Sequence, residues 1–197
     1  MNKRAFLPLA MTMMTAGLLV ACTHPMALTP ATSTTTAADP MVGGAQMFAA
    51  KTIVENAANS RDHTTLVAAV RAADLVDTLN SPGPFTVFAP TNAAFDALPA
   101  GTVPTLLKPE NKARLTGILT YHVVPGTLDS KALTAQVAAG GGSATLKTMQ
   151  GENLTVMAGA GGVTVTDSKG GVAHVTIADV YQSNGVIHVV DKVLLPN

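Results

Sequence analysis

Phe85-Thr-Val-Phe-Ala-Pro-Thr-Asn-Ala-Ala-Phe95 joins the signal for a short strand to the signal for a helix start. Residues 85–88 predict a short strand, which Pro90 ends because proline has no N–H to donate. Thr91 is placed to cap a helix over residues 92–98, since its hydroxyl can accept a hydrogen bond from a free backbone N–H. Val87 and the phenylalanines at both ends provide bulky anchors for a core that has no tryptophan.

Helical patterns dominate the first half of the chain and strand patterns dominate the second. Apolar residues recur at helical spacing over residues 52–57, 64–73, 75–79 and 109–120, with Thr64 or Thr65 as the expected cap of the second helix. β-rich runs separated by glycine clusters follow at residues 144–149, 154–157, 163–166, 172–180 and 186–195. This order predicts an α+β domain rather than an alternating parallel sheet.

Two further motifs follow the first in order: Tyr121-His-Val-Val124 and Asn184-Gly-Val-Ile-His-Val-Val-Asp-Lys-Val-Leu-Leu-Pro196. In the last motif, apolar residues point to both faces of the strand, which predicts a central strand that is covered on both sides. Together the three motifs resemble those of the fasciclin domain, over roughly residues 51–196. The resemblance implies short helices packed on a mostly antiparallel β-sheet, arranged as a wedge or sandwich. Asp74 stands where the family often has glycine, and we expect the turn to be kept because aspartate tolerates a left-handed backbone.

The N-terminus has the pattern of an export signal. Lys3 and Arg4 precede an apolar stretch that is too short to span a bilayer comfortably, and this stretch ends in Leu19-Val-Ala-Cys22. That ending resembles a bacterial lipobox, so we expect residues 1–21 to be a lipoprotein signal peptide and Cys22, the only cysteine, to be acylated and held in a lipid bilayer. Thr23 resembles the sorting pattern for the outer membrane of Gram-negative cells. A plain signal peptide with an incidental cysteine is the alternative.

Three regions are therefore expected: the signal peptide, a flexible tether rich in Thr, Ala and Pro over residues 22–46, and a fasciclin domain over residues 47–197. Hydrophobic residues make up 47% of the chain and charged residues 12%, which suits a folded domain. The formal net charge is zero and no basic stripe occurs, which argues against a nucleic-acid-binding protein.

No motif for catalysis, for a metal or for a cofactor is present in the sequence. The histidines are scattered and lack the spacing of metal ligands, and no Gly-x-Ser-x-Gly element marks a hydrolase. The glycine clusters at 140–142 and 159–162 lack the Lys-Ser/Thr of a phosphate-binding loop, and we expect both to be loops between strands. We therefore expect a protein that is not an enzyme and that needs no cofactor.

Tyr121 and His122 are the candidate contact residues, because the resemblance implies that this motif takes part in integrin binding and adhesion in some animal relatives. The other interpretation is structural, and we favour it: His122 would hydrogen-bond a polar neighbour such as Asn92 and lock the helix end. Asn92 and Asp191 are then expected to belong to a structural polar network.

The resulting hypothesis is a cell-envelope lipoprotein, anchored through Cys22, that mediates adhesion or surface protein interaction without catalysis. Its partner would be an unidentified protein or a component of the extracellular matrix. The alternative is a protein that binds a small or hydrophobic ligand in the extracytoplasmic space, in a cleft between the helices and the sheet.

Overall fold

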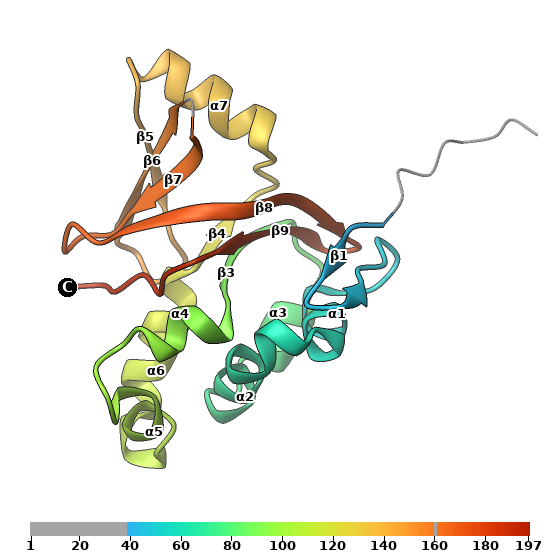
Figure 1. Cartoon of the computed structure of the whole chain (residues 1–197), viewed down its shortest axis with the longest axis vertical. Coiled ribbons are helices and arrows are strands. Elements are labelled where there is room, and N and C mark those ends of the chain that lie inside the picture. The colour runs from blue at the N-terminus through green and yellow to red at the C-terminus, as the bar shows by residue number, and fades with distance from the viewer. Residues whose placement is uncertain (1–38, 160) are drawn as a thin grey trace, which may run out of the picture. The chain divides into compact units, whose positions relative to one another are not determined.

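The computed structural model describes residues 39–159 and 161–197 (Figure 1). In this part of the chain one sheet of seven strands has the order β4-β3-β9-β8-β7-β6-β5. Its strands are β3 (Phe85–Pro90), β4 (Val123–Pro125), β5 (Ala144–Lys147), β6 (Asn153–Gly159), β7 (Gly162–Thr166), β8 (Val172–Gln182) and β9 (Gly185–Val190). The β3–β9 pair is parallel and the other pairs are antiparallel. The predicted α+β class and the mostly antiparallel sheet are therefore confirmed.

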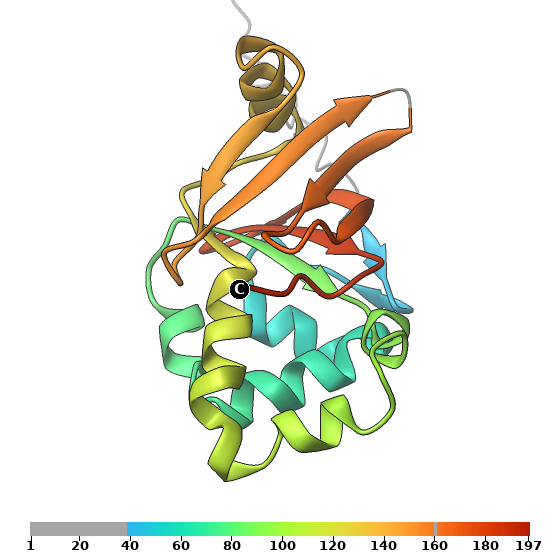
Figure 2. The ribbon, with the colours of Figure 1, turned by 90° about the vertical axis from the view of Figure 1, so that its left-hand side faces the viewer.

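Helices cover the sheet unequally, as Figures 1 and 2 show. Most of them gather on one side of the β3–β9 pair, whereas α7 packs against β5 and β6 on the other side. The helices are α1 (Ile53–Asn59), α2 (Thr64–Ala72), α3 (Val76–Asn80), α4 (Asn92–Asp96), α5 (Thr102–Leu106), α6 (Lys112–Tyr121) and α7 (Ser130–Ala139). Short 3-10 turns over Arg61–His63 and Pro109–Asn111 lead into α2 and α6.

The β3–β9 pair separates two hydrophobic cores because successive side chains of a strand point to opposite faces. Along β3, Val87 and Ala89 belong to the core under the first six helices. Phe88, between them, belongs to the second core, together with Val190 of β9 and Leu133 of α7. All six residues of β9 are buried, which confirms the predicted central strand with two covered faces. Both cores lie within the compact unit that contains the described residues.

Two local predictions are confirmed by backbone geometry. The Thr91 side chain accepts a hydrogen bond from the backbone N–H of Ala94, as a helix N-cap does. Asp74 has a φ of 55°, so aspartate adopts the left-handed turn that the lead-in helix requires. At Gly185 the backbone of β9 lies so close to that of β3 that a Cβ atom would be 2.0 Å from the carbonyl oxygen of Phe85. Only glycine fits at that start of β9.

Several elements differ from the expectation. Helices α5 and α7 and strand β4 were not predicted, and α2 is not capped by Thr64 or Thr65, because Thr64 is already its first helical residue. The glycine cluster at 140–142 follows helix α7 rather than a strand. The last strand ends at Val190, since the backbone bends at Asp191.

The folded region also begins earlier than residue 47. Strand β1 (Met41–Val42) pairs with β2 (Ala45–Gln46), and Val42 is buried in the first core. The tether prediction up to residue 46 rests on the Thr, Ala and Pro content and the scarcity of large apolar residues. Strands of two residues are too short to give a pattern that would indicate the hairpin. The predicted signal peptide, the tether before residue 39 and Cys22 lie outside the described residues. Within the described ranges, no helix combines the length and apolar character needed to cross a bilayer.

Candidate functional site

Tyr121 lies at the last turn of α6 with its side chain completely buried. Its hydroxyl group donates to the carbonyl oxygen of Asn153 at 3.0 Å and accepts from the backbone N–H of Ser168 at 3.0 Å. Burial raises the pKa of the Tyr121 hydroxyl above its usual value, which keeps the phenol protonated. The side chain therefore connects α6 to β6 and to the turn after β7.

His122 follows directly and is 2% exposed. Its Nδ1 atom lies 2.8 Å from the carbonyl oxygen of Ile118, and its Nε2 atom accepts from the backbone N–H of Leu194 at 3.0 Å. This pair of contacts requires a neutral ring with the proton on Nδ1. Burial lowers the pKa of His122 to about 4, so the ring stays neutral at physiological pH. His122 therefore joins the end of α6 to the C-terminal segment.

These positions bear on two expectations about Tyr121 and His122. Tyr121 and His122 are both buried, so in this conformation neither can contact a partner directly. The suggested partner of His122 is also wrong, because the ring binds Ile118 and Leu194 rather than Asn92. The contacts of both side chains are those of the structural interpretation.

Asn92 takes part in a separate set of hydrogen bonds. Its Oδ1 atom accepts from the backbone N–H of Thr65 at 3.0 Å, and its Nδ2 atom donates to the carbonyl oxygen of Arg61 at 2.8 Å. Asn92 thus caps helix α2 from a distant part of the chain, which explains why neither threonine is needed as the cap. Asp191 accepts a hydrogen bond from the backbone N–H of His174 at 2.7 Å, just beyond the end of β9.

Two buried polar residues that the sequence did not single out join distant elements. The Asn184 side chain accepts from the backbone N–H of Ile53 at 3.1 Å and donates to the carbonyl oxygen of Leu79 at 2.6 Å. His188 stacks on Phe88 with ring centroids 5.6 Å apart, and its Nε2 atom lies 2.7 Å from the carbonyl oxygen of Leu128. Both belong to the third motif, where a polar residue within an apolar run is the signal that indicates a buried contact.

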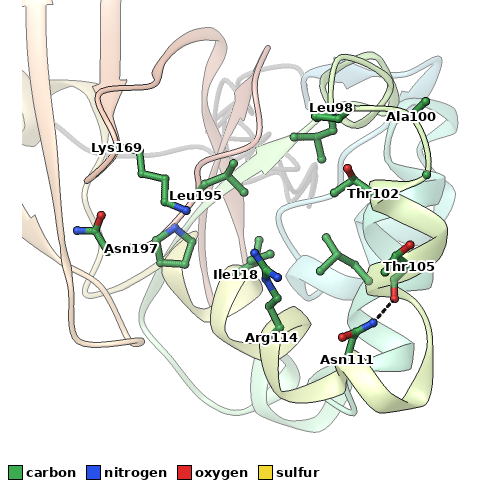
Figure 3. Close-up of a pocket in the computed structure, with 14 residues that line it drawn as sticks. Leu98, Ala100, Thr102, Thr105, Asn111, Arg114, Ile118, Lys169, Leu195 and Asn197 are labelled. Carbon is green, nitrogen blue, oxygen red and sulfur yellow. Dashed lines mark hydrogen bonds between the residues drawn. The ribbon is translucent and has the colours of Figure 1, made fainter.

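The described residues also form an open cleft of about 710 Å³ beside α6, shown in Figure 3. One side of the cleft comes from α5, α6 and the loop before α5, and the other side comes from the C-terminal segment and Lys169. The lining side chains include Leu98, Leu106, Ile118, Leu195, Arg114 and Lys169. This volume is in the range of small-molecule pockets. The sequence offers no motif for the cleft, because its residues come from segments that are far apart along the chain.

Among the residues that the structure describes, no three His, Cys, Asp or Glu side chains gather closely enough to hold a metal ion. The cleft contains two cations but no carboxylate, imidazole or thiol side chain among its lining residues. Such a lining can hold a ligand by charge and apolar contact, but it presents no side-chain pair for proton transfer.

Comparisons with known proteins agree with this fold. The family model described as Fasciclin domain matches residues 61–196. Protein sll1483 of Synechocystis sp. is 53% identical over 162 residues, which cover 82% of this chain and 83% of that protein. Cell surface glycolipoprotein MPB83 of Mycobacterium bovis is 39% identical over 123 residues, which cover 62% of this chain and 48% of that protein.

Among solved structures, the chain is similar to a fasciclin domain pair from the insect cell adhesion molecule fasciclin I. The TM-score is 0.50 at 23% sequence identity, and the match covers 64% of this chain. It covers 42% of that chain, so this protein spans less than half of the two-domain structure.

Proposed function

Because the chain belongs to the fasciclin domain family, we propose that it is a non-enzymatic binding module of the cell envelope. It is held on a bilayer by an acyl group on Cys22 and mediates adhesion to, or contact with, a protein or an extracellular polymer. Display of many copies on one membrane allows weak single contacts to add up to firm attachment.

The observation that carries this proposal is the complete internal use of the most reactive side chains in the family motif. The Tyr121 hydroxyl and both ring nitrogens of His122 are bonded to protein atoms inside the fold. An enzyme keeps such groups at hydrogen-bond distance from its substrate. Their burial supports a module that binds through its exposed surface, and it argues against Tyr121 and His122 as the contact residues.

The proposed location rests on the sequence around Cys22 and on the printed name of a relative. Leu19-Val-Ala-Cys22 has the lipobox pattern, and the chain has no other cysteine. The relative from Mycobacterium bovis is called a cell surface glycolipoprotein. The same address for this chain would put the domain outside the cytoplasm, where the Thr-rich segment after Cys22 would separate it from the membrane surface.

The anchor is tested by mass spectrometry of the mature N-terminus, combined with membrane fractionation. We expect an acylated N-terminal cysteine at position 22 and recovery of the protein in the membrane fraction. The Cys22→Ser variant should lose the acyl group, whereas Thr23→Ser, the matched control, should keep it. A mature chain that starts elsewhere, or a wild-type protein without acyl groups, would contradict the anchor.

Adhesion is tested in cells that lack the gene. We expect reduced attachment to surfaces or reduced aggregation, with recovery when the wild-type gene is returned. Cells that carry Cys22→Ser should recover less, because the module would no longer be displayed on the membrane. Normal attachment and aggregation of the deletion strain under every condition tested would contradict adhesion, whatever the result for the anchor.

A further inference from the structure

The cleft beside α6 combines an apolar lining with unpaired positive charge. Arg114 extends from α6 and Lys169 from the turn between β7 and β8, and Figure 3 shows both charged ends directed toward the space between them. The ion pairs among the described residues, Lys108–Glu110 and Lys112–Asp74, involve neither of these two cations. No acidic side chain is among the lining residues.

The apolar part of the cleft lies deeper than its charges. Ile118 is buried in the first core, and Leu98, Leu106 and Leu195 are half-buried around it. Arg114 and Lys169 are exposed, so they sit at the opening. A ligand that matches this arrangement needs an apolar body for the interior and an anionic group at one end.

We propose that this cleft binds a single-chain amphiphilic anion, a free fatty carboxylate, with its hydrocarbon chain on Ile118 and Leu106 and its carboxylate between Arg114 and Lys169. Guanidinium and ammonium groups form charge-assisted hydrogen bonds with a carboxylate. Burial of the methylene groups of the chain against these apolar side chains adds hydrophobic stabilisation. This site does not depend on an acylated Cys22 or on an adhesive role.

The wall formed by the C-terminal segment is held in place by two carboxylates outside the cleft. Asp167 accepts from the backbone N–H of Leu195 at 3.0 Å, and Glu152 accepts from that of Asn197 at 3.1 Å. The bond from Asn197 is the main cause that lowers the pKa of Glu152, and Lys169 contributes to the same shift. Since Glu152 already offsets part of the Lys169 charge, Arg114 is expected to provide the larger share of the attraction for the ligand.

A monomeric ligand fits this geometry better than a membrane surface. Insertion into a bilayer needs large protruding apolar side chains, whereas the large apolar side chains of the cleft, Leu98, Leu106, Ile118 and Leu195, are buried or half-buried. The large apolar residues that the structure exposes lie elsewhere, at Met41, Phe48, Met149, Met157, Val172 and Tyr181. The cleft is therefore assigned to a free molecule rather than to the edge of a lipid leaflet.

The test measures binding of decanoate and of decanol to the purified segment 39–197, which contains both hydrophobic cores, by calorimetry at low ionic strength. We expect decanoate to bind more tightly than the uncharged alcohol. Arg114→Gln should weaken decanoate binding about fivefold and Lys169→Gln somewhat less. Arg71→Gln and Lys131→Gln, which change exposed cations outside the cleft, should bind like the wild type.

A second variant tests the cavity independently of its charges. Thr105 is an exposed residue of the lining, and Thr105→Trp places a large side chain in the cleft while both cations remain. It should abolish decanoate binding and leave the melting temperature unchanged. Equal binding of acid and alcohol, unchanged binding by the Arg114 variant, or no binding of decanoate would overturn the proposal. Binding to anionic phospholipid vesicles without binding to monomeric decanoate would overturn it in favour of a membrane contact.

Discussion

The two ends of helix α6 differ sharply in character. At its C-terminal end, Tyr121 and His122 are buried and every polar atom is bonded to the protein. Nearer its N-terminal end, Arg114 stands at the opening of the cleft and pairs with no described carboxylate. Ile118 belongs to both regions, since its carbonyl oxygen faces His122 and its side chain lines the cleft.

The comparison shows that residues that are easily recognised in the sequence are not necessarily those available to bind another molecule. The Tyr-His motif is found directly in the sequence, but its polar side-chain atoms are bonded to protein atoms and are not free for an external molecule. The cleft has no motif, and yet it offers both space and charge. In this domain the residues of the recognisable motif hold the structure together, and the proposed binding cleft lies beside them.

The largest predicted effect comes from removing the side chain at the buried end. Tyr121→Ala should lower the free energy of unfolding by about 4 kcal/mol, because it empties a fully buried aromatic site. Tyr121→Phe keeps the ring and should cost only about 1 kcal/mol for the lost hydroxyl contacts. Urea unfolding of the purified segment 39–197 measures both values.

Tyr181, the other tyrosine of the chain, provides the matched control. Its side chain is 47% exposed and donates to Asp129 at the surface. Tyr181→Ala should therefore cost less than about 1 kcal/mol. Equal losses for the alanine variants of Tyr121 and Tyr181 would mean that the buried end is not the more tightly packed region.

The second prediction concerns the loss of folding stability at acidic pH. His122 has a pKa of about 4 when folded and a usual value of 6.5, so below pH 6.5 the unfolded chain binds more protons than the folded protein. Stability should therefore fall as the pH decreases from 6.5 to 4, by about 3 kcal/mol in total from this residue. Burial also lowers the pKa values of His63 and His188, so these two residues add to the loss of stability as the pH decreases.

The measurement is the free energy of unfolding in urea at several pH values between 7 and 4.5. The His122→Gln variant is the comparison, and the quantity of interest is its pH dependence rather than its absolute stability. We expect the variant to lose less stability per pH unit than the wild type. Identical pH dependence of the two proteins would contradict a neutral, buried His122.

Sequence patterns predicted the features that depend on neighbours along the chain. Thr91 caps α4 through a residue three positions away, and the apolar run of β9 is a local pattern with a direct structural meaning. Helix α7 was missed because its residues are mainly small or polar, and only Leu133 and Val137 are buried. A stripe of two residues is too weak a periodic signal.

Contacts between distant residues explain most of the remaining errors. The cap of α2 comes from Asn92, 27 positions beyond the N–H that it binds, so no local pattern could reveal it. The cleft likewise needs α5, α6, Lys169 and the C-terminal segment to meet in space. Burial of Tyr121 and His122 also depends on packing across the sheet, which is why the sequence left both interpretations open.

The third prediction tests a buried contact that the sequence did not single out. Asn184→Ala leaves the backbone N–H of Ile53 and the carbonyl oxygen of Leu79 without their side-chain partner, which should cost about 2 kcal/mol. Asn153→Ala is the control, because that residue is exposed, and it should change stability by less than about 0.5 kcal/mol. A stability loss no larger than that of the control would show that Asn184 does not tie α1 and α3 to the start of β9.

The smallest predicted change in stability is that of Asn92→Ala, which also tests whether Asn92 and His122 act independently. Asn92→Ala should cost about 1 kcal/mol, because α2 loses the acceptor that caps Thr65. The two residues share no partner, since Asn92 binds Arg61 and Thr65 whereas His122 binds Ile118 and Leu194. The double variant Asn92→Ala, His122→Ala should therefore be additive within about 0.5 kcal/mol. A larger coupling energy in the double-mutant cycle would contradict this independence. It would mean that the cap of α2 and the buried C-terminal end of α6 stabilise each other through contacts other than these hydrogen bonds.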